Sequence, residues 1–270
     1  MNALRLLVID PQNDFLDIEG AALPVPGADA DMARLAGLVD TLGARIDDIV
    51  VTLDSHASVG IERTTFWVTA AGDAVAAFTA ITAADVRAGA FRPRDPARGG
   101  ESLAYLEALE SGSGRTLVVW PVHCVLGTWG HNLHGGLAQS LARWEFARSR
   151  PCEKVLKGLN PMTEQYSAFR AEVPRADDPR TQTNTALLDR LASGDGPLLV
   201  AGEALSHCVA ASGEDMLARM GEDRLRNTIF LVDCMSPVTG FEAAGRQFLA
   251  LLQSRGVRTL TAAQALEALA

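Results

Sequence analysis

Residues 5–10 read RLLVID, a short run of leucine, valine and isoleucine that ends on an aspartate. Similar runs recur along the chain, each followed by a segment with helical character. They are DIVVTLD (48–54), RTLVVW (115–120), EKVLKG (153–158), PLLVAGE (197–203) and TIFLVDC (228–234). Continuous apolar runs that alternate with helices are typical of parallel strands buried on both faces of a sheet. The pattern therefore predicts a three-layer, doubly wound α/β fold with about six mostly parallel strands.

The segments between these runs have the length and apolar spacing of helices. We expect helices over 29–44, 101–111, 132–147, 183–193, 207–219 and 241–255, then a last strand in VRTLTA and a short terminal helix. Residues 57–100 fit the alternation least well, because alanine-rich sequence broken by glycine and proline stands where a short connection would suffice. We interpret residues 1–270 as one domain that carries an elaborated loop at 57–100.

The composition restricts the class of protein. A chain of 270 residues that is 48% hydrophobic can build a substantial core. Its formal net charge of −9 argues against nucleic acid and anionic membranes as partners, since both attract an excess of Lys and Arg. No apolar stretch approaches the roughly 20 residues of a membrane span, and the first ten residues do not resemble a signal peptide. We expect a cytoplasmic protein with free thiols. The composition does not decide between a monomer and a homo-oligomer.

Polar residues stand where the predicted strands end, which is where open parallel sheets bind their ligands. They are Asp10, Asp54, His56, His123, Lys157 and Cys208. Each alone has a structural interpretation: an aspartate before proline can cap a turn, a lysine can be a solvated charge, and a cysteine can be a small buried hydrophobe. Their arrival at one edge from five successive elements favours a functional site. Lys157 is also unusual because only two of the 24 basic residues are lysines.

Five motifs carry a resemblance to a known family: DPQNDF (10–15), DSH (54–56), WPVHC (120–124), KG (157–158) and GEALSHCV (202–209). With these motifs the chain resembles, from about residue 5 to 240, the isochorismatase-like cysteine hydrolases and, within them, the metal-dependent nicotinamidases. The resemblance implies a Cys/Asp/Lys triad beside a divalent metal ion. It assigns the triad to Asp10, Lys157 and Cys208.

The same resemblance makes His123 a metal ligand together with Asp54 and His56, and makes Cys124 a structural neighbour. Adjacent residues on extended chain point apart, so His123 could hardly orient Cys124 as a nucleophile. Two histidines and one carboxylate leave positions open for water and substrate. We expect zinc, with iron and manganese as alternatives. Glu62 is a candidate fourth ligand, although an exposed loop glutamate is an equally good interpretation.

The implied triad agrees with the chemistry of its side chains. Cys208 stands where a strand passes into a helix, and a helix N-terminus and a nearby ammonium both lower the pKa of a thiol. Lys157 can supply the ammonium, and Asp10 can take the thiol proton and later give it to the leaving amine. By resemblance, the backbone N–H groups of Ala204 and Cys208 form an oxyanion hole, with a cis peptide bond between Glu203 and Ala204.

Phe15, Trp120 and Tyr166 are candidates for an aromatic wall around a flat substrate ring, by analogy with the family, though each could equally belong to the core. The predicted partner is a small-molecule amide. The predicted reaction is hydrolysis of nicotinamide to nicotinate and ammonia through a thioester on Cys208. Two alternatives stay open: a related cysteine hydrolase for a different small amide, and a non-catalytic α/β binding module.

Overall fold

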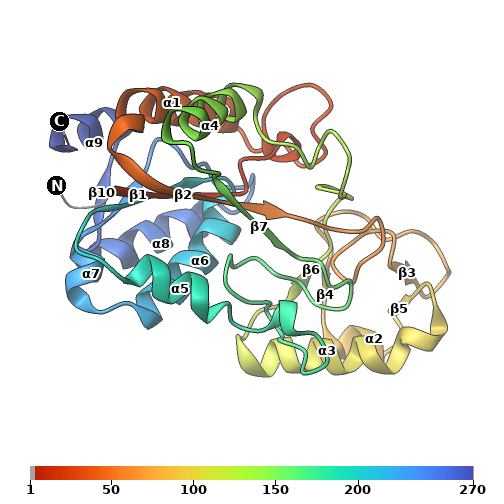
Figure 1. Ribbon diagram of the computed structural model, residues 1–270. Coiled ribbons are helices and arrows are strands. Elements are labelled where there is room, and N and C mark those ends of the chain that lie inside the picture. Colours follow the sequence, from red (N-terminus) through yellow and green to blue (C-terminus); the bar gives the residue numbers. More distant parts are fainter. Residues whose placement is uncertain (1–3, 270) are drawn as a thin grey trace.

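A six-stranded parallel sheet forms the centre of the computed structural model, which describes residues 4–269 (Figure 1). The strand order is β10 (Arg258–Leu260), β9 (Thr228–Leu231), β8 (Leu198–Gly202), β1 (Leu4–Ile9), β2 (Ile46–Asp54) and β7 (Glu153–Lys157). Every neighbouring pair is parallel. The central strands β1 and β8 are buried almost throughout, as expected of strands covered on both faces.

Helices cover both faces of this sheet (Figure 1). One face carries α1 (Ala28–Leu42) and α4 (Gly135–Arg148), which pack against each other, and α9 (Ala262–Leu269) packs against α1. The other face carries α5 (Thr185–Ala192), α6 (Ala210–Arg219), α7 (Glu222–Arg226) and α8 (Glu242–Ser254). This arrangement confirms the predicted three-layer α/β fold. Among the residues described, no helix is long and apolar enough to cross a membrane.

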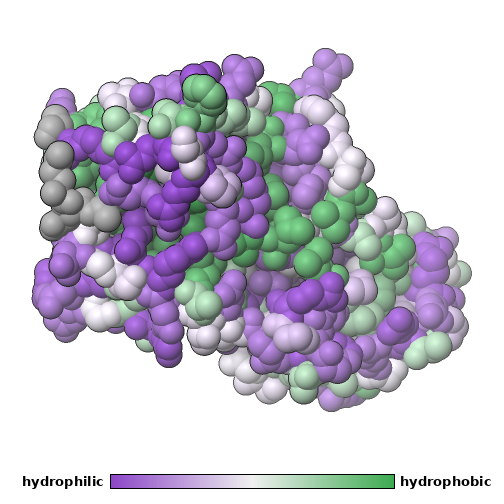
Figure 2. All heavy atoms as spheres, in the orientation of Figure 1, coloured by the Kyte–Doolittle hydropathy of each residue, from purple (hydrophilic) through white to green (hydrophobic). Residues whose placement is uncertain are grey.

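Residues 57–118 form a smaller packing unit near the carboxyl ends of β2 and β7, which we call the accessory module (Figures 1 and 2). It contains β3 (Trp67–Thr69), β4 (Ala80–Ile81), α2 (Ala83–Arg87), β5 (Phe91–Pro93), α3 (Gly99–Gly112) and β6 (Leu117–Val118). Two antiparallel pairs, β3 with β5 and β4 with β6, surround an apolar cluster that includes the fully buried Trp67 and Leu106. We propose that the module and the main sheet form one domain, because Met162 lies in the module's cluster and Tyr166 packs on the main core.

The strand predicted at 115–120 is not part of the main sheet, so that prediction is wrong. Only Leu117–Val118 forms a strand, and it pairs with β4 of the accessory module. The N–H of Trp120 donates to the Glu62 carbonyl at 2.7 Å, so the backbone that follows β6 is also hydrogen-bonded to the module. The apolar residues Leu117 and Val119 of this run therefore pack in the apolar cluster of the module. The sixth strand of the main sheet is instead β10, which lies in the predicted VRTLTA strand.

The carboxyl ends of β1 and β8 approach each other closely. Ile9 is the register partner of Gly202, whose φ is +134°. A Cβ atom at Gly202 would lie 2.0 Å from the Ile9 carbonyl oxygen, so only glycine fits. This close approach brings Asp10, the residue after β1, next to the chain that leads to Cys208.

Candidate active site

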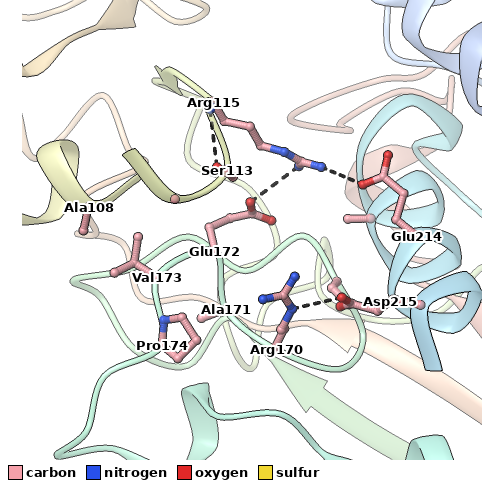
Figure 3. A pocket seen from close by; sticks show the side chains of 14 residues that line it. Ala108, Ser113, Arg115, Arg170, Ala171, Glu172, Val173, Pro174, Glu214 and Asp215 are labelled. Carbon is pink, nitrogen blue, oxygen red and sulfur yellow. Dashed lines mark hydrogen bonds and ion pairs between the residues drawn. The ribbon is translucent and has the colours of Figure 1, made fainter. Parts of the chain in front are cut away.

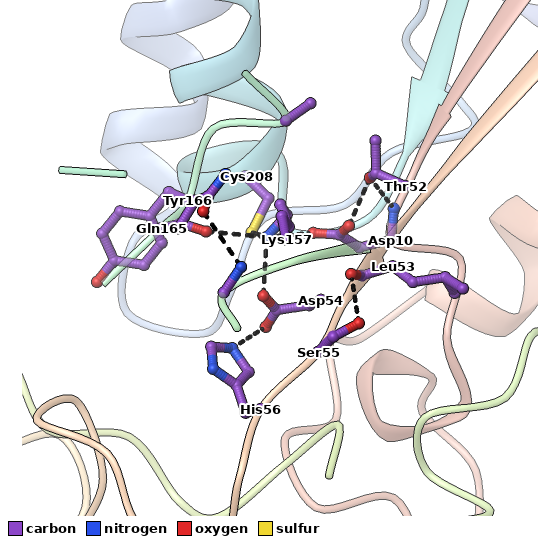
Figure 4. A network of polar contacts seen from close by, with 12 residues as sticks. Asp10, Thr52, Leu53, Asp54, Ser55, His56, Lys157, Gln165, Tyr166 and Cys208 are labelled. Carbon is purple, nitrogen blue, oxygen red and sulfur yellow. Dashed lines mark hydrogen bonds and ion pairs between the residues drawn. The ribbon is translucent and has the colours of Figure 1, made fainter. Parts of the chain in front are cut away.

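The ammonium group of Lys157 contacts both other residues predicted to be catalytic, Asp10 and Cys208 (Figure 4). Its Nζ lies 2.9 Å from Oδ2 of Asp10 and 3.5 Å from Sγ of Cys208. A further contact of 2.9 Å to Oδ1 of Asp54 reaches the residues predicted to bind metal. Asp10, Lys157 and Cys208 are 0%, 2% and 5% exposed. The structure therefore brings the predicted triad together in a site that excludes bulk water.

Strand register explains this convergence. Asp54 and Lys157 are register partners at the ends of β2 and β7. Asp10 directly follows β1 in the left-handed region, with φ of +47°, which costs a non-glycine residue about 1 kcal/mol. Its Oδ1 accepts a 2.6 Å hydrogen bond from Oγ1 of Thr52. Burial raises the pKa of Asp10, an effect that the Lys157 ammonium opposes, so this carboxylate binds a proton more readily than an exposed one.

Cys208 lies in a π-helical turn, Leu205–Val209, between β8 and α6. Burial raises the pKa of its thiol well above the usual range, and the ammonium of Lys157 opposes this only in part. The lowered thiol pKa that was expected from the helix and from Lys157 is therefore wrong. The two carboxylates nearby, Asp10 and Asp54, disfavour a further negative charge on the sulfur. Burial therefore favours the neutral thiol, so a reaction at this sulfur would need a base to take the proton.

The peptide bond between Glu203 and Ala204 is trans, as are all peptide bonds of residues 4–269, so the expected cis bond is wrong. The chain turns here because Ala204 adopts the left-handed conformation, with φ 58° and ψ 57°. The N–H of Leu205 then donates to the carbonyl of Ser236 at 2.8 Å, which fixes the start of the π-helical turn. An oxyanion hole made by the N–H groups of Ala204 and Cys208 stays a prediction.

Asp54, His56 and His123 form a buried cluster that could hold a metal ion, as predicted. Their candidate ligand atoms all lie within 4.8 Å of one another. Oδ2 of Asp54 is 2.7 Å from Nε2 of His56 and 3.3 Å from Nε2 of His123. Two imidazoles and one carboxylate make a donor set that suits a divalent cation such as zinc or iron. The residues therefore fit the expected metal, while its identity is not determined by them.

The outer nitrogens of both histidines face the accessory module. Nδ1 of His56 lies 3.2 Å from Oε1 of Glu62, which is only 1% exposed, so the interpretation of Glu62 as an exposed loop residue is wrong. Nδ1 of His123 lies 2.8 Å from the Pro121 carbonyl, to which Nη1 of Arg63 also donates at 2.9 Å. Glu62 thus stands behind His56 and outside the three-residue cluster, in a position to orient the imidazole ring.

The two histidines differ in their pKa values. Burial is the largest single effect on His56 and lowers its pKa, but the charge of Asp54 and the hydrogen bonds to Asp54 and Glu62 together raise this pKa to about 9. Burial lowers the pKa of His123 to about 4, and the nearby guanidinium of Arg63 adds to this effect. Near neutral pH these shifts favour the neutral imidazole at His123 and the protonated imidazole at His56, beside the carboxylate of Asp54.

Two residues of the first motif fix the backbone around the predicted metal ligands, and sequence reasoning missed both. Gln12 accepts from the N–H of Asp54 at 2.7 Å and donates to its carbonyl at 2.9 Å. Asp14 accepts from the N–H of Cys124 at 2.6 Å, and the Cys124 carbonyl accepts from the N–H of His56 at 3.1 Å. Cys124 thus contacts the site through its backbone, as expected of a structural neighbour. In the sequence, the motif DPQNDF was the only indication that Gln12 and Asp14 hold the backbone of the site.

A pocket of about 20 Å³ lies beside Cys208, with room for about one water molecule. Phe15, Trp120 and Tyr166, the predicted substrate wall, all line it. Nε1 of Trp120 donates to Oη of Tyr166 at 3.0 Å, and the two rings meet edge to face. The three aromatic residues are therefore placed at the pocket, and their contact with a substrate ring stays a prediction.

Further residues of this pocket were missed by sequence reasoning; they are Leu23, Glu164, His207 and Val238. Glu164 is buried, and burial raises its pKa to about 7. The sequence offered weak signals for two of them, because Glu164 stands two residues before Tyr166 and His207 directly precedes Cys208. Leu23 and Val238 lie in irregular segments without any motif.

A separate cavity of about 580 Å³ lies beside α3 and α6 (Figure 3). Arg115 pairs there with Glu172 at 3.5 Å and with Glu214 at 3.1 Å, and Arg170 pairs with Asp215 at 2.9 Å. None of the predicted catalytic or metal residues lines it. The cavity is therefore not the predicted site.

Comparison with known proteins gives a likeness in structure. No family model matches the sequence, and no curated protein matches it either. An Acinetobacter baumanii nicotinamidase pyrazinamidase has a TM-score of 0.64 at 21% identity, over 97% of both chains. A Pyrococcus horikoshii pyrazinamidase in complex with zinc has a TM-score of 0.55 at 20% identity, over 96% of this chain and 98% of that chain.

An isochorismatase family protein from Desulfovibrio vulgaris has a TM-score of 0.54 at 17% identity, over 100% of this chain and 99% of that chain. These likenesses extend over almost the whole chain, so they include the accessory module as well as the main sheet. The chain therefore has the fold of the isochorismatase-like hydrolases.

Proposed function

We propose that this protein is a metal-dependent cysteine amidase and that nicotinamide is its substrate. The observation that carries the proposal is the position of Asp54, whose two carboxylate oxygens contact Lys157 on one side and both histidines on the other. The proposed nucleophile Cys208 and two of the proposed metal ligands, Asp54 and His123, line one pocket. Nicotinamidases and pyrazinamidases with the same fold support an amide as the substrate class.

In the first half of the reaction, Asp10 takes the proton from the Cys208 thiol as the sulfur attacks the carbonyl carbon of the amide. The C=O π electrons move to the oxygen, and the N–H groups of Ala204 and Cys208 stabilise the resulting oxyanion. When the carbonyl re-forms, the C–N bond breaks and Asp10 gives its proton to the leaving nitrogen. Ammonia departs, and the acyl group remains on Cys208 as a thioester.

In the second half, Asp10 takes a proton from a water molecule that attacks the thioester carbonyl. The C–S bond then breaks, the sulfur regains a proton from Asp10, and the carboxylic acid leaves. Lys157 keeps its proton throughout: burial would lower its pKa, but Asp10 and Asp54 raise it well above the usual range. Its positive charge stabilises the negative charge that develops on the sulfur and the charge of the Asp10 carboxylate.

Asp54, His56 and His123 would hold the metal ion, which supplies a Lewis acid for a ring nitrogen or for water. Zinc is the metal we propose. The side chains of Phe15 and Trp120 would confine a flat ring so that its carboxamide reaches Cys208, a positioning effect that lowers the entropy cost of the reaction. NAD salvage in the cytoplasm is the setting that nicotinamide as substrate would suggest.

The test is ammonia release from nicotinamide by the metal-loaded protein, with a panel of other small amides in parallel. Cys208→Ala is expected to abolish release, because the thioester cannot form. Cys124→Ala is the matched control and should keep most of the activity, since Cys124 contacts the site through its backbone and its side chain lies in the core. If ammonia were released from another amide and not from nicotinamide, that amide would replace nicotinamide as the proposed substrate. No release from any amide, with the thiol of Cys208 inert, would favour the non-catalytic binding module.

A further inference from the structure

The pocket beside Cys208 has two partly exposed side chains in its lining. All other residues that line it are buried, whereas Tyr166 and His207 are partly exposed. Its volume of about 20 Å³ is far too small for a substrate ring, so side chains have to move before a ring can bind. Among the residues that line the pocket, Tyr166 and His207 therefore separate it from the exterior.

His207 is the less firmly held of the two. Its Nδ1 contacts Oγ of Ser206, the preceding residue, at 2.9 Å, and within residues 4–269 no carboxylate forms an ion pair with it. The ring otherwise packs against aromatic rings, with centroid distances of 5.0 Å to Trp120 and 4.6 Å to Phe241. Tyr166, in contrast, accepts the hydrogen bond from Trp120. Rotation of His207 therefore breaks one local hydrogen bond and no ion pair.

Outside these two side chains lies a groove of about 370 Å³, which we call the outer groove. Tyr166 and His207 line both the outer groove and the pocket, so they form the wall between the two spaces. The apolar residues of its lining are Val118, Ala210, Phe241, Ala244, Phe248 and Leu251. When His207 turns away, the groove becomes continuous with the pocket.

The charges at the rim of the outer groove are already compensated. Arg115 and Glu214 both line it, and they pair with each other at 3.1 Å. Arg115 also pairs with Glu172 at 3.5 Å (Figure 3). A charged substrate group would find Arg115 and Glu214 already paired, whereas an apolar group would leave water for the apolar part of the lining.

We propose that the outer groove is a substrate subsite for an uncharged, apolar group attached to the ring of the amide. His207 is the movable side chain between this subsite and Cys208. The inference rests on the proposed amidase function and narrows its substrate class. It predicts that nicotinamide with a butyl chain on ring carbon 5 is hydrolysed with a kcat/KM about tenfold above that of nicotinamide, because the chain is buried in the groove.

Ala244→Trp tests the subsite, because Ala244 lines the groove on α8 and belongs to neither the triad nor the metal cluster. Ala243→Trp is the matched control on the same helix, since Ala243 is exposed and does not line the groove. Ala244→Trp is expected to lower the ratio of kcat/KM for the butyl amide to that for nicotinamide by about tenfold. Two results would overturn the subsite but not the amidase function. One is an equal kcat/KM ratio in both variants, and the other is hydrolysis of nicotinamide without hydrolysis of the butyl amide.

A second measurement needs no amide turnover, so it separates failure of the subsite from failure of the amidase. His207→Ala is treated with bulky N-phenylmaleimide and with small iodoacetamide, and labelling of Cys208 is followed by mass spectrometry. The ratio of the two rates removes any change in thiol reactivity. We expect this ratio to rise about tenfold over the unmodified protein, since steric access is what changes. An unchanged ratio in a folded variant would show that His207 does not separate the groove from Cys208.

Discussion

Oδ1 of Asp54 lies 2.9 Å from Nζ of Lys157, and both residues are 4% exposed or less. The other oxygen, Oδ2, faces the two histidines. Burial alone would raise the pKa of Asp54, but His56 and Lys157 hold it well below its usual value. Asp54 therefore stays ionised, and its one negative charge is shared between the proposed nucleophile set and the proposed metal site.

Lys157→Arg should lower kcat for amide hydrolysis by about 100-fold or more, although the charge is retained. The wider, planar guanidinium cannot occupy the space between Asp10, Asp54 and Cys208 that a compact ammonium fills. Steady-state kinetics with ammonia detection measures the effect. Lys154→Met is the control, because Lys154 is partly exposed and pairs with Glu145 at the surface. A near-normal kcat in Lys157→Arg would contradict the proposed role.

Alkylation of Cys208 by iodoacetamide should become faster as the pH rises, without a plateau in the neutral range. Burial raises the pKa of this thiol, so below that pKa the reactive thiolate fraction grows about tenfold per pH unit. Lys157→Met should slow the labelling further at each pH, because the ammonium lowers the thiol pKa. A plateau below pH 7 would show that the thiolate already exists in the resting protein.

His123→Ala should weaken zinc binding by more than about 100-fold, since even loss of an outer partner of a metal ligand costs roughly 10–100-fold. Competition with a chelator measures this affinity. The apparent KM for nicotinamide should rise, while labelling of Cys208 by iodoacetamide stays close to normal. His134→Asn is the control, because His134 lies outside the cluster and asparagine preserves its capping role at α4. If His123→Ala retained its full metal content, His123 would not be a metal ligand.

Gly202→Ala should lower the free energy of unfolding by roughly 2–4 kcal/mol, because the added Cβ meets the backbone of Ile9 at a positive φ. Gly256→Ala is the matched control: its φ is +72°, but a Cβ there has no atom within 4 Å. It should cost about 1 kcal/mol, from backbone strain alone. Urea denaturation of both variants checks the difference, and equal losses would mean that the contact with β1 is easily relieved.

The sequence was sufficient to predict the layers of the fold and which of the proposed catalytic and metal-binding residues lie together. Apolar runs such as RLLVID mark strands buried on both faces, and polar residues at their ends, such as Asp10 and Lys157, converge because parallel strands end at one edge. The run at 115–120 has the same composition as a central strand. It could not be assigned correctly, because its partner β4 depends on long-range packing in the accessory module.

The finer features of the site depend on burial, which a sequence pattern does not report. Cys208 was expected to have a lowered thiol pKa from its helix and its lysine neighbour, but desolvation dominates in the folded chain. The sequence left Glu62 open between a metal ligand and an exposed loop residue, and its burial against His56 depends on long-range packing of the accessory module. His207 has no recognisable pattern beyond its place next to Cys208.

Glu62 and Arg63 belong to the accessory module, yet they hold the outer sides of the two histidines proposed to bind metal. Detachment of the module from the sheet would therefore free both imidazole rings while β1, β7 and β8 kept Asp10, Lys157 and Cys208 in place. The protein would then lose its affinity for the cation before it lost its nucleophile. Occupation of the site by a cation should in turn protect the backbone amides of residues 57–118 from hydrogen exchange, so that local opening of one segment and ligand binding at another are thermodynamically linked.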